Sequence, residues 1–168
     1  MDQYADIITS ANAPYGLHRP RKIEQFTGTK ILSLRMTKRP CFTYSNIDTF
    51  VTRAYLTIKP QKSVSMKYLT ALFNSNLFYY WLFYNGKRKG KQLQIDQAQI
   101  VELPIFIPDV EIIDVISEKF DLISQSILNN TDYEEIENEI NMMLYKIYDI
   151  EQDEVNRINQ FLDEREVD

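Results

Sequence analysis

The last third of the chain has the most regular pattern of apolar and polar positions. Its apolar side chains recur in steps of three and four, at Ile113, Ile116, Phe120, Ile123 and Ile127. This spacing predicts an amphipathic helix of about 19 residues with one apolar seam. Asn129 and Asn130 are expected to end the helix, because Asn is favoured after a helical C-terminus.

Two further helices are predicted after this one. Thr131 and Glu134 have the spacing of a capping box, which predicts a helix start. The apolar seam of that helix consists of Ile136, Ile140, Met143 and Ile147. A third, shorter helix is expected over residues 153–162. The short connections favour an antiparallel helical hairpin that covers a sheet or packs against a neighbouring domain.

The first two thirds alternate β-branched and aromatic residues with polar ones over short stretches. Strands are expected at residues 30–36, 41–44 and 51–59, because prolines and a polar Asn-Ile-Asp step separate these stretches. Residues 1–26 are expected to form loops. The predicted fold class is α+β, with a small, mostly antiparallel sheet and helices, followed by the C-terminal antiparallel helical hairpin.

A helical region is expected between the strands and the last third. Ser63 or Ser65 is placed to cap a helix that starts near Met66. An interruption is expected at residues 74–76, before the aromatic residues 78–84 (FYYWLFY) resume the helix. Residues 99–107 are expected to be extended, up to Pro108. We interpret the aromatic run as core rather than as a platform for stacked bases.

A short basic loop is expected after the aromatic run. It contains Lys87, Arg88, Lys89 and Lys91, with glycines at positions 86 and 90. Glycine lets the backbone lie close to a surface, and Lys and Arg bind phosphate oxygens. Gln92 and Gln94 follow, and glutamine side chains pair with adenine edges in the major groove, although their alternation with Leu93 equally suits the polar face of a strand. The loop therefore predicts a contact with double-stranded DNA.

Charge is distributed unevenly along the chain. Residues 1–108 hold 15 Lys and Arg against 6 Asp and Glu, a net charge of +9, whereas residues 109–168 hold 4 against 18, a net charge of -14. We therefore expect a basic α+β domain over 1–108 and an acidic helical subdomain over 109–168. A basic face suits nucleic acid, and the acidic part is expected to be solvated or to dock a basic partner.

Further basic residues are candidates for the same contact. Arg35, Lys38 and Arg39 lie at the end of a predicted strand, where they either reach a DNA groove or protect a sheet edge. Next to the chain's only histidine, the candidates for a phosphate-binding arm are Arg19, Arg21 and Lys22.

No catalytic residue, cofactor or metal site is predicted. Cys41 and His18 are the only residues of their types, so neither an internal disulfide nor a Cys/His metal set is expected. The chain also lacks a glycine-rich cofactor loop and the Asn-Pro-Pro-aromatic motif of adenine-N6 methyltransferases. It has no apolar stretch near the roughly 18 residues that span a bilayer, and no signal sequence is apparent, which predicts a cytoplasmic protein.

The order of several short motifs resembles the TaqI-like C-terminal specificity domain. The motifs are residues 29–35 (TKILSLR), 68–75 (YLTALFNS), the basic loop, 102–105 (ELPI) and 144–150 (LYKIYDI). The resemblance extends from about Arg21 to Leu162. One departure is Asp149, where similar sequences have Gly, so a different turn shape is expected there.

The resemblance implies a non-catalytic target recognition domain. In type IIG restriction-modification enzymes and related adenine-N6 DNA methyltransferases, such a domain selects the sequence that a separate methyltransferase or endonuclease module modifies or cuts. The ELPI step is also similar to the junction before the spacer helix in type I specificity subunits, so half of such a subunit is an alternative. A protein-interaction module and an RNA-binding domain are also compatible with the sequence.

Overall fold

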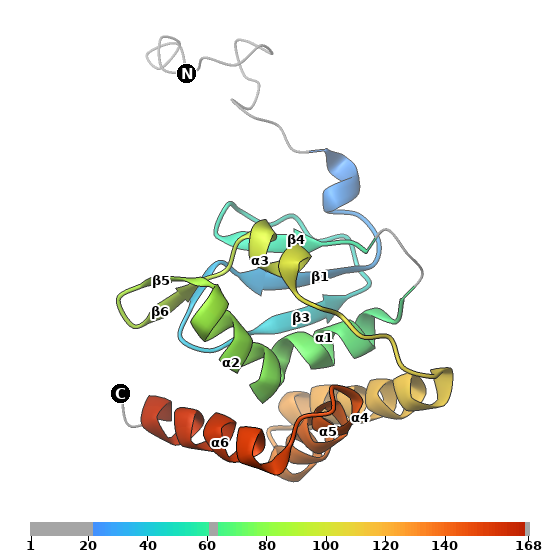
Figure 1. Cartoon of the computed structure of the whole chain (residues 1–168). Helices are drawn as coiled ribbons and strands as arrows, with labels where there is room; N and C mark the ends of the chain where they lie inside the picture. Colours follow the sequence, from blue (N-terminus) through green and yellow to red (C-terminus); the bar gives the residue numbers. More distant parts are fainter. Residues whose placement is uncertain (1–21, 61–63, 167–168) are drawn as a thin grey trace, which may run out of the picture.

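The computed structural model describes residues 22–60 and 64–166, which form three layers. A three-stranded sheet forms one outer layer, helices α1 and α2 lie in the middle, and helices α4, α5 and α6 form the other outer layer (Figure 1). The chain is therefore α+β, as the sequence predicts. Of the expected N-terminal loop only residues 22–26 are described, and Ile23–Gln25 form a 3-10 turn.

Two small antiparallel sheets replace the single expected sheet. The first has the order β3-β1-β4 and the second the order β2-β6-β5. The strands are β1 (Lys30–Leu34), β2 (Met36–Thr37), β3 (Phe42–Ser45), β4 (Tyr55–Ile58), β5 (Lys87–Lys89) and β6 (Gln92–Gln94). In the first sheet the central strand β1 pairs Lys30 with Ser45 of β3 and Leu34 with Tyr55 of β4.

The expected strand over residues 30–36 is divided at Arg35. The Arg35 backbone N–H donates to the Ala54 carbonyl oxygen at 2.9 Å, and the Arg35 carbonyl accepts from Ile95 N–H at 2.8 Å. The backbone of Arg35 thus forms hydrogen bonds on the side of each sheet. The hydrophobic pattern predicts a strand at these positions but not the change of partner.

The helices α1 (Met66–Asn74) and α2 (Asn76–Asn85) are separated by Ser75. The Ser65 hydroxyl accepts from Tyr68 N–H at 3.2 Å, so Ser65 is the cap of α1. The Ser75 hydroxyl accepts from Phe78 N–H, also at 3.2 Å, and so caps α2. The predicted interruption at residues 74–76 is confirmed.

The chain between the second sheet and the C-terminal helices was predicted wrongly in part. Residues expected to be extended from Gln99 instead form helix α3 (Gln97–Glu102) and extend only from Leu103. The helix forms here because Asp96 is its N-cap. The Asp96 N–H donates to Oε1 of Gln99 at 2.8 Å, as in a capping box.

The C-terminal layer consists of α4 (Val110–Asn129), α5 (Glu134–Ile147) and α6 (Gln152–Glu166). Asn130 ends α4 in a left-handed conformation, as predicted. The Thr131 capping box is wrong, because the Asp132 carboxylate accepts from Glu134 N–H at 3.0 Å instead. Asp149 adopts φ 52°, a left-handed conformation that favours glycine.

One apolar core joins the layers. It contains Ile31 of β1, Leu72 of α1 and Phe78 of α2, together with Ile116 of α4 and Leu144 of α5. Each such side chain contributes about 1.5–3 kcal/mol when fully buried. No helix within residues 22–60 and 64–166 is long and apolar enough to cross a membrane.

Candidate nucleic-acid interface

The expected basic loop is a β-hairpin. Strands β5 and β6 pair antiparallel, with Lys87 opposite Gln94 and Lys89 opposite Gln92. Gly90 and Lys91 make the turn between them, and Gly90 has a positive φ of 61° that favours glycine. The expected basic loop is therefore two short strands and a tight turn, and Gln92 and Gln94 lie on a strand, which their alternation with Leu93 had left open.

The register of the hairpin sorts its side chains onto two faces. Side chains alternate along a strand, and directly opposed residues share a face. Lys87, Lys89, Gln92 and Gln94 therefore lie on one face, which we call the outer hairpin face. On the other face Leu93 is only 2% exposed, so that face turns toward the core. The outer hairpin face carries two ammonium groups and two amides.

Aromatic packing holds the inner face of the hairpin against α2. The Arg88 guanidinium lies 4.2 Å from the centroid of the Phe83 ring, a cation–π contact. Gly86 joins α2 to the hairpin, and a Cβ there would lie 2.3 Å from the Leu82 carbonyl oxygen. Arg88 is thus turned away from the outer hairpin face, which sequence alone did not indicate.

The C-terminal helix also holds the hairpin, through a residue that the sequence analysis missed. Arg165 Nη2 donates to the Lys91 carbonyl oxygen at 2.9 Å, and Nε donates to the Tyr79 hydroxyl at 3.3 Å. The same guanidinium lies 5.1 Å from the Phe83 ring centroid. Figure 1 shows the end of α6 on the same side of the molecule as β5 and β6. In the sequence, Arg165 is marked only by its place as a cation in the last turn of an acidic helix, which does not indicate a contact with the hairpin.

An ion pair lies beside the outer hairpin face. Arg35 Nη1 contacts Asp96 Oδ1 at 3.0 Å, and Gln94 Nε2 donates to Asp96 Oδ2 at 2.9 Å. Asp96 therefore neutralises Arg35 and fixes the Gln94 amide, since only the amide nitrogen is a donor to a carboxylate. The Gln94 carbonyl oxygen is left as the acceptor, which suits an amino group on a base edge.

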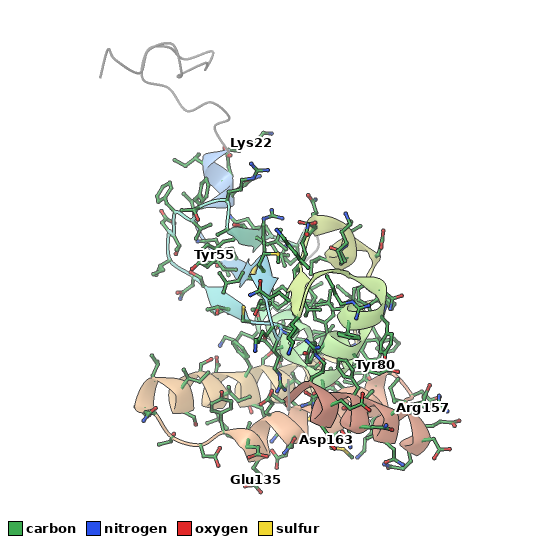
Figure 2. All side chains as sticks on the ribbon, turned by 90° about the vertical axis from the view of Figure 1, so that its left-hand side faces the viewer. Lys22, Tyr55, Tyr80, Glu135, Arg157 and Asp163 are labelled. Atoms are coloured by element: carbon green, nitrogen blue, oxygen red, sulfur yellow. The ribbon has the colours of Figure 1, made fainter. Side chains whose placement is uncertain are left out.

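The remaining candidates are not all brought to the hairpin. Lys38 is exposed, and its carbonyl accepts from the Tyr79 hydroxyl at 3.1 Å. Arg39 Nη2 instead lies 3.3 Å from Glu137 Oε1 of α5 and 2.9 Å from Asn76 Oδ1, at the end of α2 remote from the hairpin. Lys22 lies at the opposite end of the molecule from Glu135 (Figure 2). Arg19 and Arg21 lie outside the described residues.

Part of the positive charge is used inside the fold. Lys30 is fully buried, and its ammonium donates to the carbonyls of Gly28 and Ile47. The Lys67 ammonium pairs with Asp121. In contrast, Lys87 and Lys89 are exposed and form no ion pair with another described residue. The net charge of the N-terminal part therefore overstates the charge available to a ligand.

The aromatic run is buried only in part: Phe78 and Tyr79 are buried, Tyr80, Trp81 and Phe83 are half-buried, and Tyr84 is exposed. Phe161 of α6 contacts the rings of Tyr79, Tyr80, Phe83 and Tyr84, with centroid distances of 4.8–6.0 Å. The interpretation of the run as core is confirmed for Tyr79, holds in part for Tyr80, Trp81 and Phe83, which pack against the core, and is wrong for Tyr84. Across residues 22–60 and 64–166, no cluster of three or more His, Cys, Asp or Glu side chains is arranged to hold a metal ion.

Comparison with known proteins identifies a family. No curated protein matches the chain. The sequence model of the TaqI-like C-terminal specificity domain matches residues 2–105, more than half of the chain. The matched region includes both sheets and the hairpin but ends before α4, well short of Leu162. The chain belongs to the TaqI-like C-terminal specificity domain family.

Proposed function

We propose that this chain reads the DNA target of a restriction-modification enzyme and places its outer hairpin face in the major groove. The main support for this proposal is the strand register, which sets Lys87, Lys89, Gln92 and Gln94 on one face. A major groove about 12 Å wide accepts a two-stranded β-ribbon. Family membership supports a specificity role, in which target selection rather than chemistry is the task.

Each group of the hairpin has a distinct role in this proposal. Lys87 and Lys89 neutralise phosphates and set the register on the duplex, while Gln92 and Gln94 contact base edges. Arg88 does not contact DNA in this proposal. Its cation–π contact with Phe83 holds the hairpin against α2. Lys91 and Lys38 add charge at the margins, and a separate methyltransferase or endonuclease module supplies the catalytic groups.

In this proposal the acidic helices α4, α5 and α6 support the DNA-binding part of the chain. Ile116 and Leu144 belong to the same core cluster as the residues of β1 and α1. The Arg39 pair with Glu137 adds a link between the basic and acidic parts. We therefore propose the division at Pro108 as a division of function, with residues 1–108 binding DNA and residues 109–168 orienting them.

A salt series tests the proposal. Fluorescence anisotropy would measure binding of a mixed-sequence DNA duplex to the wild type and to the double variant Lys87→Ala/Lys89→Ala. Affinity should fall steeply with salt, and the log–log slope should become shallower by about 1.8 in the variant, about 0.9 for each lost phosphate contact. Single-stranded RNA should bind more weakly than the duplex, since Tyr79, Tyr80 and Phe83 pack against Phe161 and are not free to stack on bases.

A matched control separates the hairpin from overall charge. Lys146→Ala/Arg157→Ala also removes two positive charges, from exposed positions on α5 and α6, of which Arg157 is labelled in Figure 2. Its salt slope should equal that of the wild type. Equal slopes for all three proteins would reject the hairpin as the DNA contact, and stronger binding of RNA would reject duplex recognition.

A further inference from the structure

The segment between α3 and α4 has the form of a strand without a neighbour. Residues 104–108 have the sequence Pro-Ile-Phe-Ile-Pro and cross from the sheet layer to the helical layer (Figure 1). A residue before proline is restricted to extended conformations, and both Leu103 and Ile107 stand in that position. Leu103 and Ile107 are therefore held extended, and the segment between them runs as an extended trace that belongs to neither sheet (Figure 1).

Two tyrosine hydroxyls bond the inner edge of this segment. Tyr148 accepts from Phe106 N–H at 3.1 Å and donates to the Pro104 carbonyl at 3.0 Å. Tyr68 donates to the Phe106 carbonyl at 2.7 Å. In an extended chain the N–H and C=O of alternate residues point to one side, so these three groups form a single edge, as in a sheet ladder.

The outer edge is open. The backbone N–H and C=O groups of Ile105 and Ile107 form no hydrogen bond within the described residues. By alternation these groups point away from the two tyrosines. An unpaired edge of this kind is a template for another strand, and proteins usually shorten, charge or cover it. Here the prolines at 104 and 108 limit it to three residues.

The side chains on this segment are apolar and exposed. Ile105, Phe106 and Ile107 are 37%, 53% and 47% exposed, and Val110 at the start of α4 is 61% exposed. Contiguous exposed apolar side chains mark interaction sites. Between Gln92 and Glu118 the chain has no Lys or Arg, and Glu102, Asp109 and Glu111 flank the segment.

We propose that residues 105–107 dock an extended segment of a partner protein by adding it as a β-strand. The open backbone edge specifies the conformation of the partner, the exposed side chains require apolar residues at alternate positions, and the flanking carboxylates favour basic residues at its ends. This surface goes beyond the DNA-reading role and does not depend on it. It lies in a different part of the chain from the outer hairpin face.

A peptide selection tests this docking surface. Random peptides of about eight residues, displayed on phage, would be selected on the full-length wild type. The enriched sequences should alternate apolar residues and carry Lys or Arg near their ends. Anisotropy with a labelled selected peptide should then show about tenfold weaker binding to Ile107→Pro, because proline removes one N–H of the outer edge. Ile107→Val, which keeps the N–H, should bind within about twofold of the wild type.

Hydrogen exchange locates the bound peptide. The amides of Ile105 and Ile107 should become protected when the peptide binds, whereas those of the hairpin should not change. The variant Glu102→Gln/Glu111→Gln should bind the selected peptide more weakly while its thermal unfolding stays unchanged. This variant therefore tests the surface even if Ile107→Pro perturbs the fold. Absence of any selected peptide, equal binding to Ile107→Pro, or protection elsewhere would overturn the proposal. Concentration-dependent dimers lost in Ile107→Pro would overturn it in favour of a second copy of this chain.

Discussion

Gly86 and Gly90 flank the first strand of the hairpin, but different constraints select glycine at the two positions. At Gly90 the backbone is left-handed, with φ +61°, and an added Cβ would meet nothing within 4 Å. At Gly86 the obstacle is packing, because the Cβ would lie 2.3 Å from a backbone oxygen of α2. The first glycine therefore sets the approach of the hairpin to the helix, and the second sets its turn.

Alanine substitutions distinguish the two constraints. Gly86→Ala should lower the free energy of unfolding by about 2 kcal/mol and displace the hairpin, because backbone at Leu82 has to move. Gly90→Ala should cost about 1 kcal/mol, the usual penalty for a left-handed Ala, and Gly90→Asn less. Urea unfolding measures both energies, and DNA affinity should fall more for Gly86→Ala. A larger loss of stability for Gly90→Ala would contradict the packing argument.

At the scale of elements, α6 is a strut for the hairpin. Phe161 fills the space beside Tyr79, Tyr80 and Phe83, and Arg165 bonds the Lys91 carbonyl in the hairpin turn. A helix outside the family match thus contacts the proposed DNA-reading element. The position of the outer hairpin face consequently depends on Arg165, which is 74 positions from Lys91 in sequence.

Removing this strut should loosen the hairpin without unfolding the protein. Arg165→Ala should speed hydrogen exchange of the β5 and β6 amides by about tenfold and weaken duplex binding, because two hydrogen bonds and a cation–π contact are lost. Arg157→Ala, at an exposed position of the same helix, is the control and should leave exchange unchanged. The strut interpretation fails if the two variants show the same hairpin exchange.

Long elements with a repeated apolar spacing could be predicted from the sequence, and short elements could not. The seam of α4 has five apolar positions in steps of three and four, so its helix and its end at Asn130 follow directly. The hairpin strands have three residues each, of which Leu93 is the one buried apolar side chain. Helix α3 was missed because a single cap at Asp96 decides it. Short elements depend on capping and on tertiary partners, which periodicity does not record.

The candidate site shows the same limit. A cluster of cations is visible in sequence, but its division into an outer hairpin face and an inward Arg88 requires the register. Arg39 was grouped with Arg35 by proximity, yet their partners are Glu137 and Asp96, in different layers. Such pairings join residues far apart in the chain, so they follow from the fold and not from local composition.

For the whole molecule, the buried Tyr68 and the half-buried Tyr148 link the layers through residues 104–106, and Tyr145 of α5 is also buried. Burial raises the pKa of Tyr68 well above its usual range, and the neighbouring Tyr148 raises it further. Burial also raises the pKa of Tyr145 and of Tyr148, although the Phe106 N–H bond opposes the shift at Tyr148. The Tyr68 and Tyr148 hydroxyls need their protons, because each donates to a carbonyl of residues 104–106.

Stability should therefore fall at alkaline pH. Below the ordinary tyrosine pKa of 10.0 the side chains are neutral in both states, and their contribution is fully present. As pH rises above 10.0 the unfolded tyrosines ionise first, and the contribution is lost progressively toward the higher folded pKa. Each such tyrosine adds a slope of up to about 1.4 kcal/mol per pH unit.

Urea unfolding of the wild type and Tyr68→Phe between neutral and alkaline pH measures this slope. Tyr68→Phe should be less stable at neutral pH by about 1 kcal/mol, because the bond to the Phe106 carbonyl is lost. Its stability should then decline less steeply above pH 10.0, so the two curves converge. Tyr84→Phe, at a position 62% exposed, is the control and should decline as steeply as the wild type. Parallel curves for wild type and Tyr68→Phe would mean that Tyr68 ionises as readily in the folded protein as in the unfolded chain, and that its buried bond does not hold residues 104–106 in place.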